Sequence, residues 1–147
     1  MSDFREYVVF KVNEEYYGID IKYVENIEKM LPITRVPYTD QYVEGVVNLR
    51  GNVIPVIDLR KRFELSREDF DDESRIIIVN FKEYAVGMIA DSSSEVLQLD
   101  PEDIDPAPSV RGSGGEEFVY EIGKNEGRII MLIDLQKVLG VENIETQ

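Results

Sequence analysis

Residues 45–59 read GVVNLRGNVIPVIDL, which places two β-branched runs on either side of Gly51-Asn52. A Gly-Asn dipeptide between two such runs predicts a β-hairpin with a two-residue turn. Pro55 has no N–H to donate, so the second strand should lie at a sheet edge or bulge at that point. Asp58 follows the second strand and should cap a short helix over residues 59–63. The segment therefore predicts a hairpin that leads into a capped helix.

The same pattern recurs later in the chain. Residues 127–135 read GRIIMLIDL and align with residues 51–59, 76 positions earlier. Segments nearer the N-terminus align at an offset of 69, because the second half carries a longer loop rich in Pro and Gly; they are residues 8–12 with 77–81, 17–19 with 86–88, and 26–30 with 95–99. This pattern indicates an internal duplication, with five short strands and one capped helix in each half.

Short strands with one helix per half favour a mainly β fold of two pseudo-symmetric, partly closed barrels. Barrels of about 65 residues are small for independent cores, so the two should share an apolar seam. We expect a single domain over residues 1–147, with halves at about 6–65 and 75–141 and an acidic linker at about 66–74. The expected arrangement allows strands to be exchanged between the halves at the seam. A further short helix should begin at Thr39 or Asp40 and end at Val43.

The composition excludes several classes of chemistry. The 147 residues carry a net charge of −14, from 30 acidic and 16 basic residues, and include no His, Cys or Trp. A Ser-His-Asp triad, a thiolate nucleophile and a cysteine-ligated metal are therefore impossible. The acidic charge disfavours nucleic acid as a partner. Five basic residues precede the linker and are where partner specificity is expected: Arg35, Arg50, Arg60, Lys61 and Arg62.

No apolar run reaches the roughly 18 residues of a membrane span, so a cytoplasmic protein without membrane insertion is expected. The acidic stretch at residues 68–73 lacks the Gly and closing Glu of an EF-hand loop. The Gly-rich stretch at residues 112–115 lacks the Gly-Lys-Ser/Thr of a phosphate-binding loop. Neither stretch predicts a metal or cofactor.

Asp58 and Asp134 leave one enzymatic alternative open. A pair of carboxylates can hydrolyse glycosides, and a carboxylate- or metal-dependent hydrolase would bring two acids together in a concave pocket. Their matched positions before short helices favour a capping role instead. On balance the sequence predicts that the protein is not an enzyme.

Arg50 stands at the end of a strand in a very apolar segment. Its charge must reach water or find a carboxylate. It is either an exposed turn residue or a guanidinium fixed by an acid and presented to a partner, since Arg is enriched at binding hot spots. Its counterpart in the second half is Glu126, so the barrel itself does not require the charge.

Residues 45–59 resemble the CheW family of bacterial chemotaxis adaptors, and residues 17–21, 86–91 and 104–108 resemble CheW segments in the same order. The resemblance covers about residues 6–140. It implies two five-stranded SH3-like barrels and no catalysis or cofactor. It also implies an adaptor that couples the cytoplasmic tip of methyl-accepting chemoreceptors to the regulatory domain of the histidine kinase CheA, in rings beneath the receptor array. The chain begins and ends with the domain, which favours a free adaptor, monomeric in isolation, over a CheW-like domain of CheV or CheA.

The resemblance also implies contact residues. The receptor candidates, of which Val24, Ile27 and Val96 should be exposed, are Val24, Ile27, Glu28, Arg50, Val96 and Leu97. The kinase candidates at one end are Pro37, Tyr38, Tyr42, Val43, Gly45, Val46 and Asn48, and those at the other end are Pro106, Pro108 and Val110.

One residue departs from the family pattern. CheW proteins commonly carry Glu where this chain has Asn26, and that Glu is thought to pair with the Arg of the Asn-Leu-Arg-Gly motif. Glu28 would lie on the same face of a strand as Asn26, because side chains alternate with a period of two. We therefore hypothesise an Arg50–Glu28 ion pair, or a hydrogen bond from Arg50 to Asn26.

Overall fold

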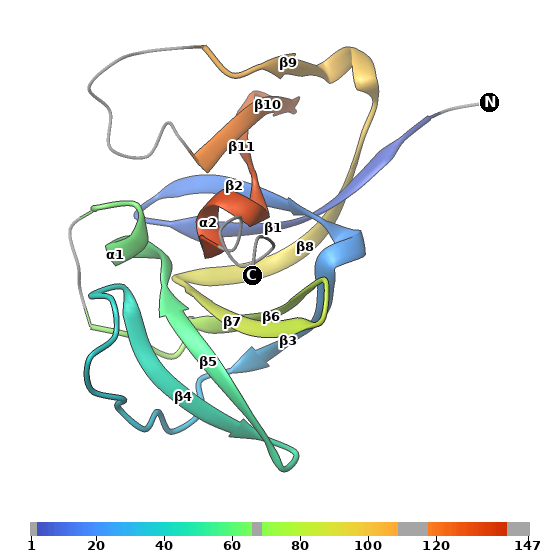
Figure 1. The fold of residues 1–147 in the computed structure, drawn as a ribbon. Coiled ribbons are helices and arrows are strands. Elements are labelled where there is room, and N and C mark those ends of the chain that lie inside the picture. The colour runs from blue at the N-terminus through green and yellow to red at the C-terminus, as the bar shows by residue number, and fades with distance from the viewer. Residues whose placement is uncertain (1–2, 66–68, 109–117, 141–147) are drawn as a thin grey trace.

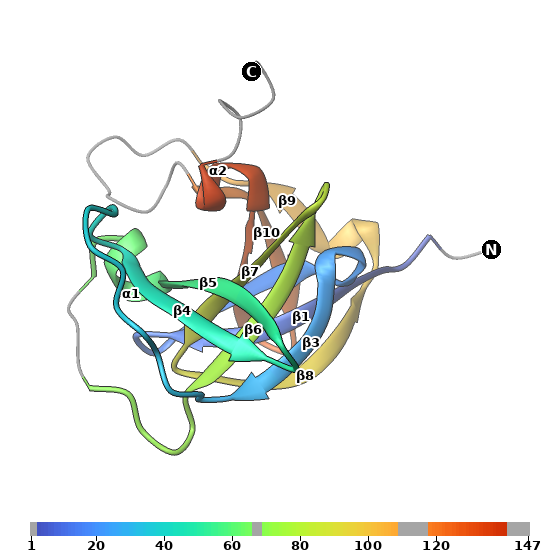
Figure 2. The same cartoon turned by 60° about the horizontal axis from the view of Figure 1, so that its bottom comes forward.

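The computed structural model describes residues 3–65, 69–108 and 118–140, and these form two β-sheets with two short helices (Figures 1 and 2). The strands are β1 Arg5–Val12, β2 Glu15–Asp20, β3 Val24–Lys29, β4 Val43–Leu49, β5 Asn52–Asp58, β6 Arg75–Phe81, β7 Tyr84–Ala90, β8 Ser92–Leu99, β9 Ile104–Pro106, β10 Val119–Asn125 and β11 Arg128–Ile133. The helices are α1 Leu59–Arg62 and α2 Leu135–Leu139, with 3₁₀ turns η1 Ile21–Tyr23 and η2 Pro101–Asp103.

The strand orders of the two sheets match once the internal repeat is applied. One sheet has the order β3-β6-β7-β5-β4, and the other has the order β8-β1-β2-β11-β10-β9. The offsets of 69 and 76 residues pair β1 with β6, β2 with β7, β3 with β8, β4 with β10 and β5 with β11. Replacing each strand by its counterpart converts the first order into the second, apart from the additional β9. The duplication predicted from the sequence is therefore present in the fold.

Each sheet combines strands from both halves of the chain. β1 and β2 join β8, β9, β10 and β11, whereas β3, β4 and β5 join β6 and β7. The halves meet in two parallel pairs, β2 with β11 and β5 with β7, and these pairs are also related by the repeat. β-Bulges recur at matching places too, at Glu25 in β3 and at Ser94 in β8. Because of this exchange, neither barrel is built from one continuous half of the chain.

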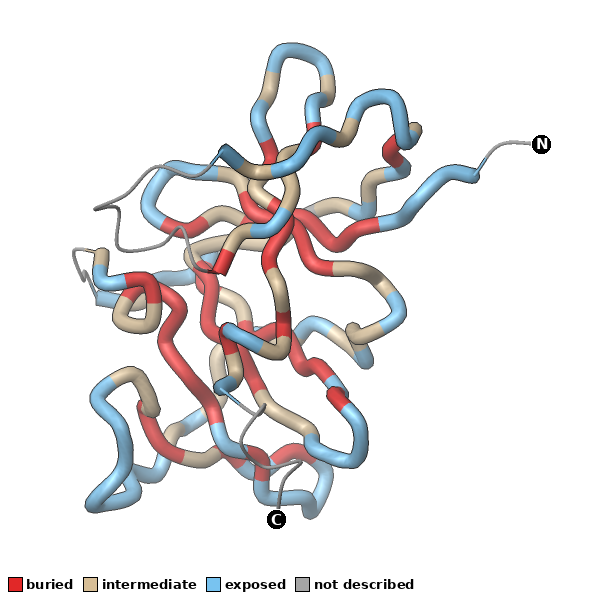
Figure 3. The backbone as a smooth tube through the Cα atoms, turned by 45° about the horizontal axis from the view of Figure 1, so that its top comes forward, coloured by how far each residue is buried: buried red, intermediate tan, exposed pale blue. Residues whose placement is uncertain are grey.

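Three apolar clusters of described residues form the core, and β1 and β6 contribute to two of them each. Buried segments run through the interior of the molecule, whereas the outer loops are exposed (Figure 3). Tyr7 and Val9 of β1 face a small cluster inside the six-stranded sheet, whereas Val8 and Phe10 face a larger central cluster. The alternating residues of β6 divide in the same way between the five-stranded sheet and the central cluster. Successive side chains of a strand point to opposite faces, so a strand that is apolar throughout can fill two cores. The central cluster is the predicted apolar seam.

The β4–β5 hairpin turns one residue earlier than predicted. Leu49 pairs with Asn52, so Arg50 and Gly51 form the two-residue turn. Both have positive φ, 52° and 88°, as a type I′ turn requires. Glu126 and Gly127 repeat this geometry between β10 and β11, with φ of 48° and 80°. Arg50 therefore sits at the tip of a hairpin rather than at the end of a strand.

The two capped helices predicted after Asp58 and Asp134 are present, but the prediction of a further helix ending at Val43 is wrong. Asp58 accepts a hydrogen bond from the Arg60 N–H at 3.0 Å and caps α1; Asp134 caps α2, which ends at left-handed Gly140. Residues 41–42 form a turn, because Val43 is already paired with Ile57 in the β4–β5 ladder. Pro55 is exposed in a central strand, and this is tolerated because β5 pairs with β7 only from Val56 onward.

The repeat yields a paired stability prediction at Gly18 of β2 and Gly87 of β7. A Cβ at Gly87 would lie 2.7 Å from side-chain carbons of both Ile76 and Val56, whereas at Gly18 the closest atoms are at 3.0 and 3.2 Å. Gly87→Ala should therefore lower the free energy of unfolding by about 1–3 kcal/mol through overpacking. Gly18→Ala should lower it less. Urea unfolding of both variants checks this, and an equal or larger loss at Gly18 would contradict it.

Candidate functional site

The predicted Arg50–Glu28 ion pair is present. Arg50 Nη2 lies 3.5 Å from Glu28 Oε2, and Asn26 Nδ2 donates to the same oxygen at 2.6 Å. Asn26 and Glu28 thus share one face of β3, as their spacing predicts. The Glu28 side chain is 21% exposed, whereas that of Arg50 is 72% exposed. Exposed ion pairs add little stability, so this pair orients a guanidinium that stays accessible.

Two exposed β-branched residues lie near the pair along the chain. Ile27 lies on the outer face of β3, because it alternates with Asn26 and Glu28, and is 39% exposed. Val53 follows the β4–β5 turn and is 69% exposed. An accessible guanidinium beside apolar side chains is typical of a protein-docking surface.

Val24 does not join this surface, and the expectation that it is exposed is wrong. Its side chain is partly buried and packs against the central cluster. The physical reason is that the start of β3 lies over the central cluster. The bulge between Val24 and Asn26 places Val24 opposite Val79. Val24 thereby shares a face with Ile27, which lies opposite Ile77, and both of these β6 partners belong to that cluster. A bulge moves the side chains before it to the other face of the strand. Val24 therefore contributes to the seam, whereas Asn26 faces the barrel.

The other receptor candidates lie on β8. Val96 is 53% exposed and corresponds to Ile27 at the repeat offset of 69 residues. Leu97 points to the opposite face and packs against the core cluster of the six-stranded sheet. β3 and β8 are each an edge strand of their own sheet. The exposed candidates therefore occupy equivalent positions on two sheet edges.

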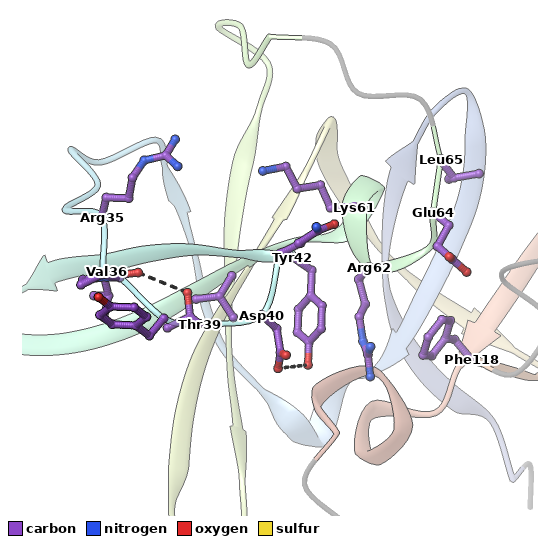
Figure 4. A pocket seen from close by; sticks show the side chains of 14 residues that line it. Arg35, Val36, Thr39, Asp40, Tyr42, Lys61, Arg62, Glu64, Leu65 and Phe118 are labelled. Carbon is purple, nitrogen blue, oxygen red and sulfur yellow. Dashed lines mark hydrogen bonds between the residues drawn. The ribbon is translucent and has the colours of Figure 1, made fainter.

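A groove of about 1090 Å³ lies beside the start of β4 and beside α1 (Figure 4). It is lined by four kinase candidates, Pro37, Tyr38, Tyr42 and Val43. Of the remaining candidates on β4, Gly45 and Val46 are less available, whereas Asn48 is exposed. Gly45 is buried against the Thr34 carbonyl, and the backbone N–H and carbonyl of Val46 both bond Thr34 at 2.8 Å. The Asn48 side chain accepts a hydrogen bond from the Gly51 N–H.

Arg62 organises this groove, and sequence reasoning missed its role. Its Nε donates to the Val138 carbonyl at 2.7 Å and its Nη2 to the Lys137 carbonyl at 3.0 Å. Its guanidinium carbon lies 4.2 Å from the ring centre of Tyr42 and 4.8 Å from that of Phe118 (Figure 4). A cation at the end of α2 is favoured by the helix dipole. Arg62 therefore ties the first half of the chain to the last helix of the second half.

The environment of Tyr42 reflects the same packing. Burial raises the pKa of its hydroxyl, and the nearby Arg62 charge opposes this shift. The hydroxyl also donates to Asp40 Oδ2 at 3.1 Å, which favours its protonated form. Tyr42 thus stays a neutral hydrogen-bond donor at the rim of the groove.

Pro106 and Pro108 are exposed at the far end of the molecule. Pro106 closes β9, which lies at the opposite end from β4 (Figure 1). Val110 lies outside the described residues. The two groups of kinase candidates are therefore well separated.

Comparison with known proteins places this geometry in a family. A model of the CheW-like domain matches residues 6–143. The chain belongs to the CheW family. It is 39% identical to the chemotaxis protein CheW of Bacillus subtilis, over 95% of this chain and 89% of that protein. It is 35% identical to the chemotaxis protein CheW of Klebsiella aerogenes, over 95% of this chain and 84% of that protein.

The fold agrees with that of a solved CheW. The crystal structure of the scaffolding protein TtCheW from Thermoanaerobacter tengcongensis matches with a TM-score of 0.86 and 39% identity, over 97% of this chain and 95% of that one. The mainly β, CheW-like fold predicted from the sequence is thereby confirmed. So is its assignment as a chemotaxis scaffold.

The carboxylates proposed for a hydrolase have structural roles in this CheW chain. Asp58 and Asp134 each cap a helix, and Asp58 also lies 3.9 Å from Arg60 Nε. Over the described ranges, no group of three or more acidic side chains is placed to hold a metal ion. Nor does any helix of those ranges have the length and apolarity to cross a membrane.

Arg62 provides a test of how the groove is held. Arg62→Met keeps an unbranched side chain between the two rings but removes both hydrogen bonds to α2. It should lower the free energy of unfolding by about 2–3 kcal/mol, because hydrogen bonds from a charged group are lost. Lys124→Met, which removes a solvent-exposed ion pair with Asp105, is the control and should change it by less than about 1 kcal/mol. Urea unfolding distinguishes the two, and equal losses would contradict the role of Arg62.

Proposed function

We propose that this CheW protein couples methyl-accepting chemoreceptors to the histidine kinase CheA through protein–protein contacts, without catalysis. The observation that carries the proposal is the Arg50 guanidinium, which Glu28 orients while most of its surface stays exposed. Such a group offers charge-assisted hydrogen bonds to a partner without first breaking a strong internal contact. The family assignment supplies the partners.

The receptor contact is proposed to involve Arg50, Ile27 and Val96. Ile27 and Val96 are exposed, β-branched and located on equivalent edge strands. Rigid apolar side chains lose little conformational entropy on binding. Glu28 would act by orienting Arg50, whereas Val24 and Leu97 would support the surface from beneath because they pack against the core. The cytoplasmic tip of a receptor is the proposed occupant.

The kinase contacts are proposed to lie at the two far ends. The groove beside α1 presents aromatic and cationic side chains, and the β9 end presents Pro106 and Pro108. Two pseudo-symmetric barrels offer two similar docking ends, which suits alternation with the CheW-like regulatory domain of CheA in a ring. A monomer in isolation, recruited from the cytoplasm to receptor arrays, completes the proposal.

The receptor surface is tested by two substitutions. Ile27→Asp and Arg50→Glu should each lower the affinity for a soluble receptor-tip fragment at least about tenfold, because each removes a central contact. Both should unfold at nearly the wild-type temperature, since their side chains are exposed. Phe4→Asp, at an apolar residue that is 49% exposed, is the control for a new surface charge. Calorimetric titration and a thermal melt measure both properties; wild-type affinity in both variants would contradict the surface.

The kinase surface is tested at Tyr38, whose side chain is fully exposed at the groove. Tyr38→Ala should weaken binding to the CheA regulatory domain by about three- to thirtyfold, because aromatic residues are common hot spots. Its affinity for the receptor fragment should stay at the wild-type value. A loss of receptor binding instead would place Tyr38 on the other surface.

A further inference from the structure

A second arginine–glutamate pair joins β8 to the β10–β11 hairpin. Arg128 Nη1 lies 2.6 Å from Glu95 Oε1, and Arg128 Nη2 donates to Asn125 Oδ1 at 2.8 Å. The guanidinium carbon also lies 5.0 Å from the ring centre of Tyr16 on β2. The hydrogen bond to Glu95 raises the pKa of Arg128 further above its ordinary value. Arg128 is thus fixed by partners on several strands.

This pair joins an edge strand to a hairpin of its barrel, as Arg50–Glu28 does in the other barrel. The repeat offsets carry Glu95 onto Asn26 and Arg128 onto Asn52. Asn26 lies two residues before Glu28 on one face of β3, and Asn52 lies two residues after Arg50. The two pairs join corresponding elements of the two barrels, but through residues that differ by two positions on each element. In both barrels an arginine–glutamate pair therefore fastens the edge strand to the hairpin tip.

The two pairs differ in how far their arginines are exposed. The Arg50 side chain is 72% exposed and reaches Glu28 at 3.5 Å, whereas that of Arg128 is 26% exposed. Arg50 is consequently presented to solvent, while Arg128 is held between protein groups. The two pairs thus serve different purposes: one offers a charge and the other fixes a strand.

The strand that Arg128 fixes carries a receptor candidate. Among the residues that the structure describes, β8 pairs with β1 alone and is an edge strand. Edge strands open more readily than central ones, because only one ladder holds them. Glu95 and Val96 are adjacent, so their side chains point to opposite faces of β8. Glu95 points toward Arg128, and Val96 points toward solvent. Fixing Glu95 therefore fixes the position from which Val96 projects.

We propose that the Arg128–Glu95 pair positions β8 for receptor binding, which makes Arg128 and Glu95 positioning residues of the surface around Val96. The inference rests on the proposed function, since it takes the receptor tip as the occupant of that surface. Neither residue needs to touch the receptor.

Calorimetric titration of the full chain with a receptor-tip fragment and with the CheA regulatory domain tests the proposal. Glu95→Gln and Arg128→Gln should each weaken receptor binding by about three- to tenfold, as loss of one fixed ion pair allows. The double variant Glu95→Arg with Arg128→Glu should recover most of the affinity by restoring the pair in reverse. CheA binding should stay within about twofold of the wild-type value, since its proposed contacts lie elsewhere.

A control and a second measurement make the outcomes distinct. Asp105→Asn removes the Lys124–Asp105 pair, 3.0 Å long in the same sheet, and should leave receptor binding unchanged. Amide exchange across β8, measured without receptor, should become faster in Glu95→Gln and return toward the wild-type rate in the reversed pair. Unchanged receptor affinity in the single variants, absence of rescue, or an equal loss in the control would overturn the inference alone. No binding of the receptor fragment by the wild type would instead overturn the proposed function.

Discussion

The double burial of β1 and β6 is the constraint on which the rest of the structure depends. Alternate side chains of each strand enter a barrel cluster on one face and the central cluster on the other. A strand can do this only if sheets or helices cover both of its faces. Exchange of strands between the halves provides that cover, because each sheet takes strands from both halves. The two barrels are thereby held in one fixed relation, as a scaffold with several docking surfaces requires.

Most of the docking candidates lie on or beside the edge strands of the two sheets. β3 and β8 are sheet edges, and β4 and β9 are the opposite edges of the same two sheets. Open edges invite unwanted pairing unless they are covered, bulged or charged. This chain uses all three devices: Thr34 pairs with Val46 on β4, bulges interrupt β3 and β8, and ion pairs flank both. Features that keep an edge from aggregating also present specific side chains on it.

Much of the fold could be predicted because its signals are local. The strand period of two predicts that Asn26 and Glu28 share one face, and the capping residues Asp58 and Asp134 predict the two short helices that follow them. The misses have physical reasons as well. The sequence predicts a turn at Gly51-Asn52, one residue later than the observed turn at Arg50-Gly51, because Gly can adopt the positive φ of a type I′ turn at either of its two positions. Val24 is partly buried because it packs against the central cluster, whose other members come from distant segments, and no local pattern predicts that contact. Arg62 bonds to carbonyls 75 and 76 residues away, which a single sequence does not reveal.

The five basic residues expected to mark the partner surface fall into two groups: Arg60, Lys61 and Arg62 are used within the fold, whereas Arg35 and Arg50 are exposed. Arg60 is 5% exposed and reaches Asp91 at 3.3 Å, and Lys61 reaches Glu44 at 2.7 Å. Arg62 donates hydrogen bonds to backbone carbonyls in the last turn of α2. These three charges are neutralised or used within the fold, in keeping with the cost of burying an unpaired charge. Arg50 differs because the I′ turn holds it at a hairpin tip, where it reaches its carboxylate and still faces water. In a chain with a net charge of −14, a cation displayed in this way is a distinctive feature for an acidic partner to recognise. The proposed recognition at Arg50 thus rests on turn geometry as much as on charge.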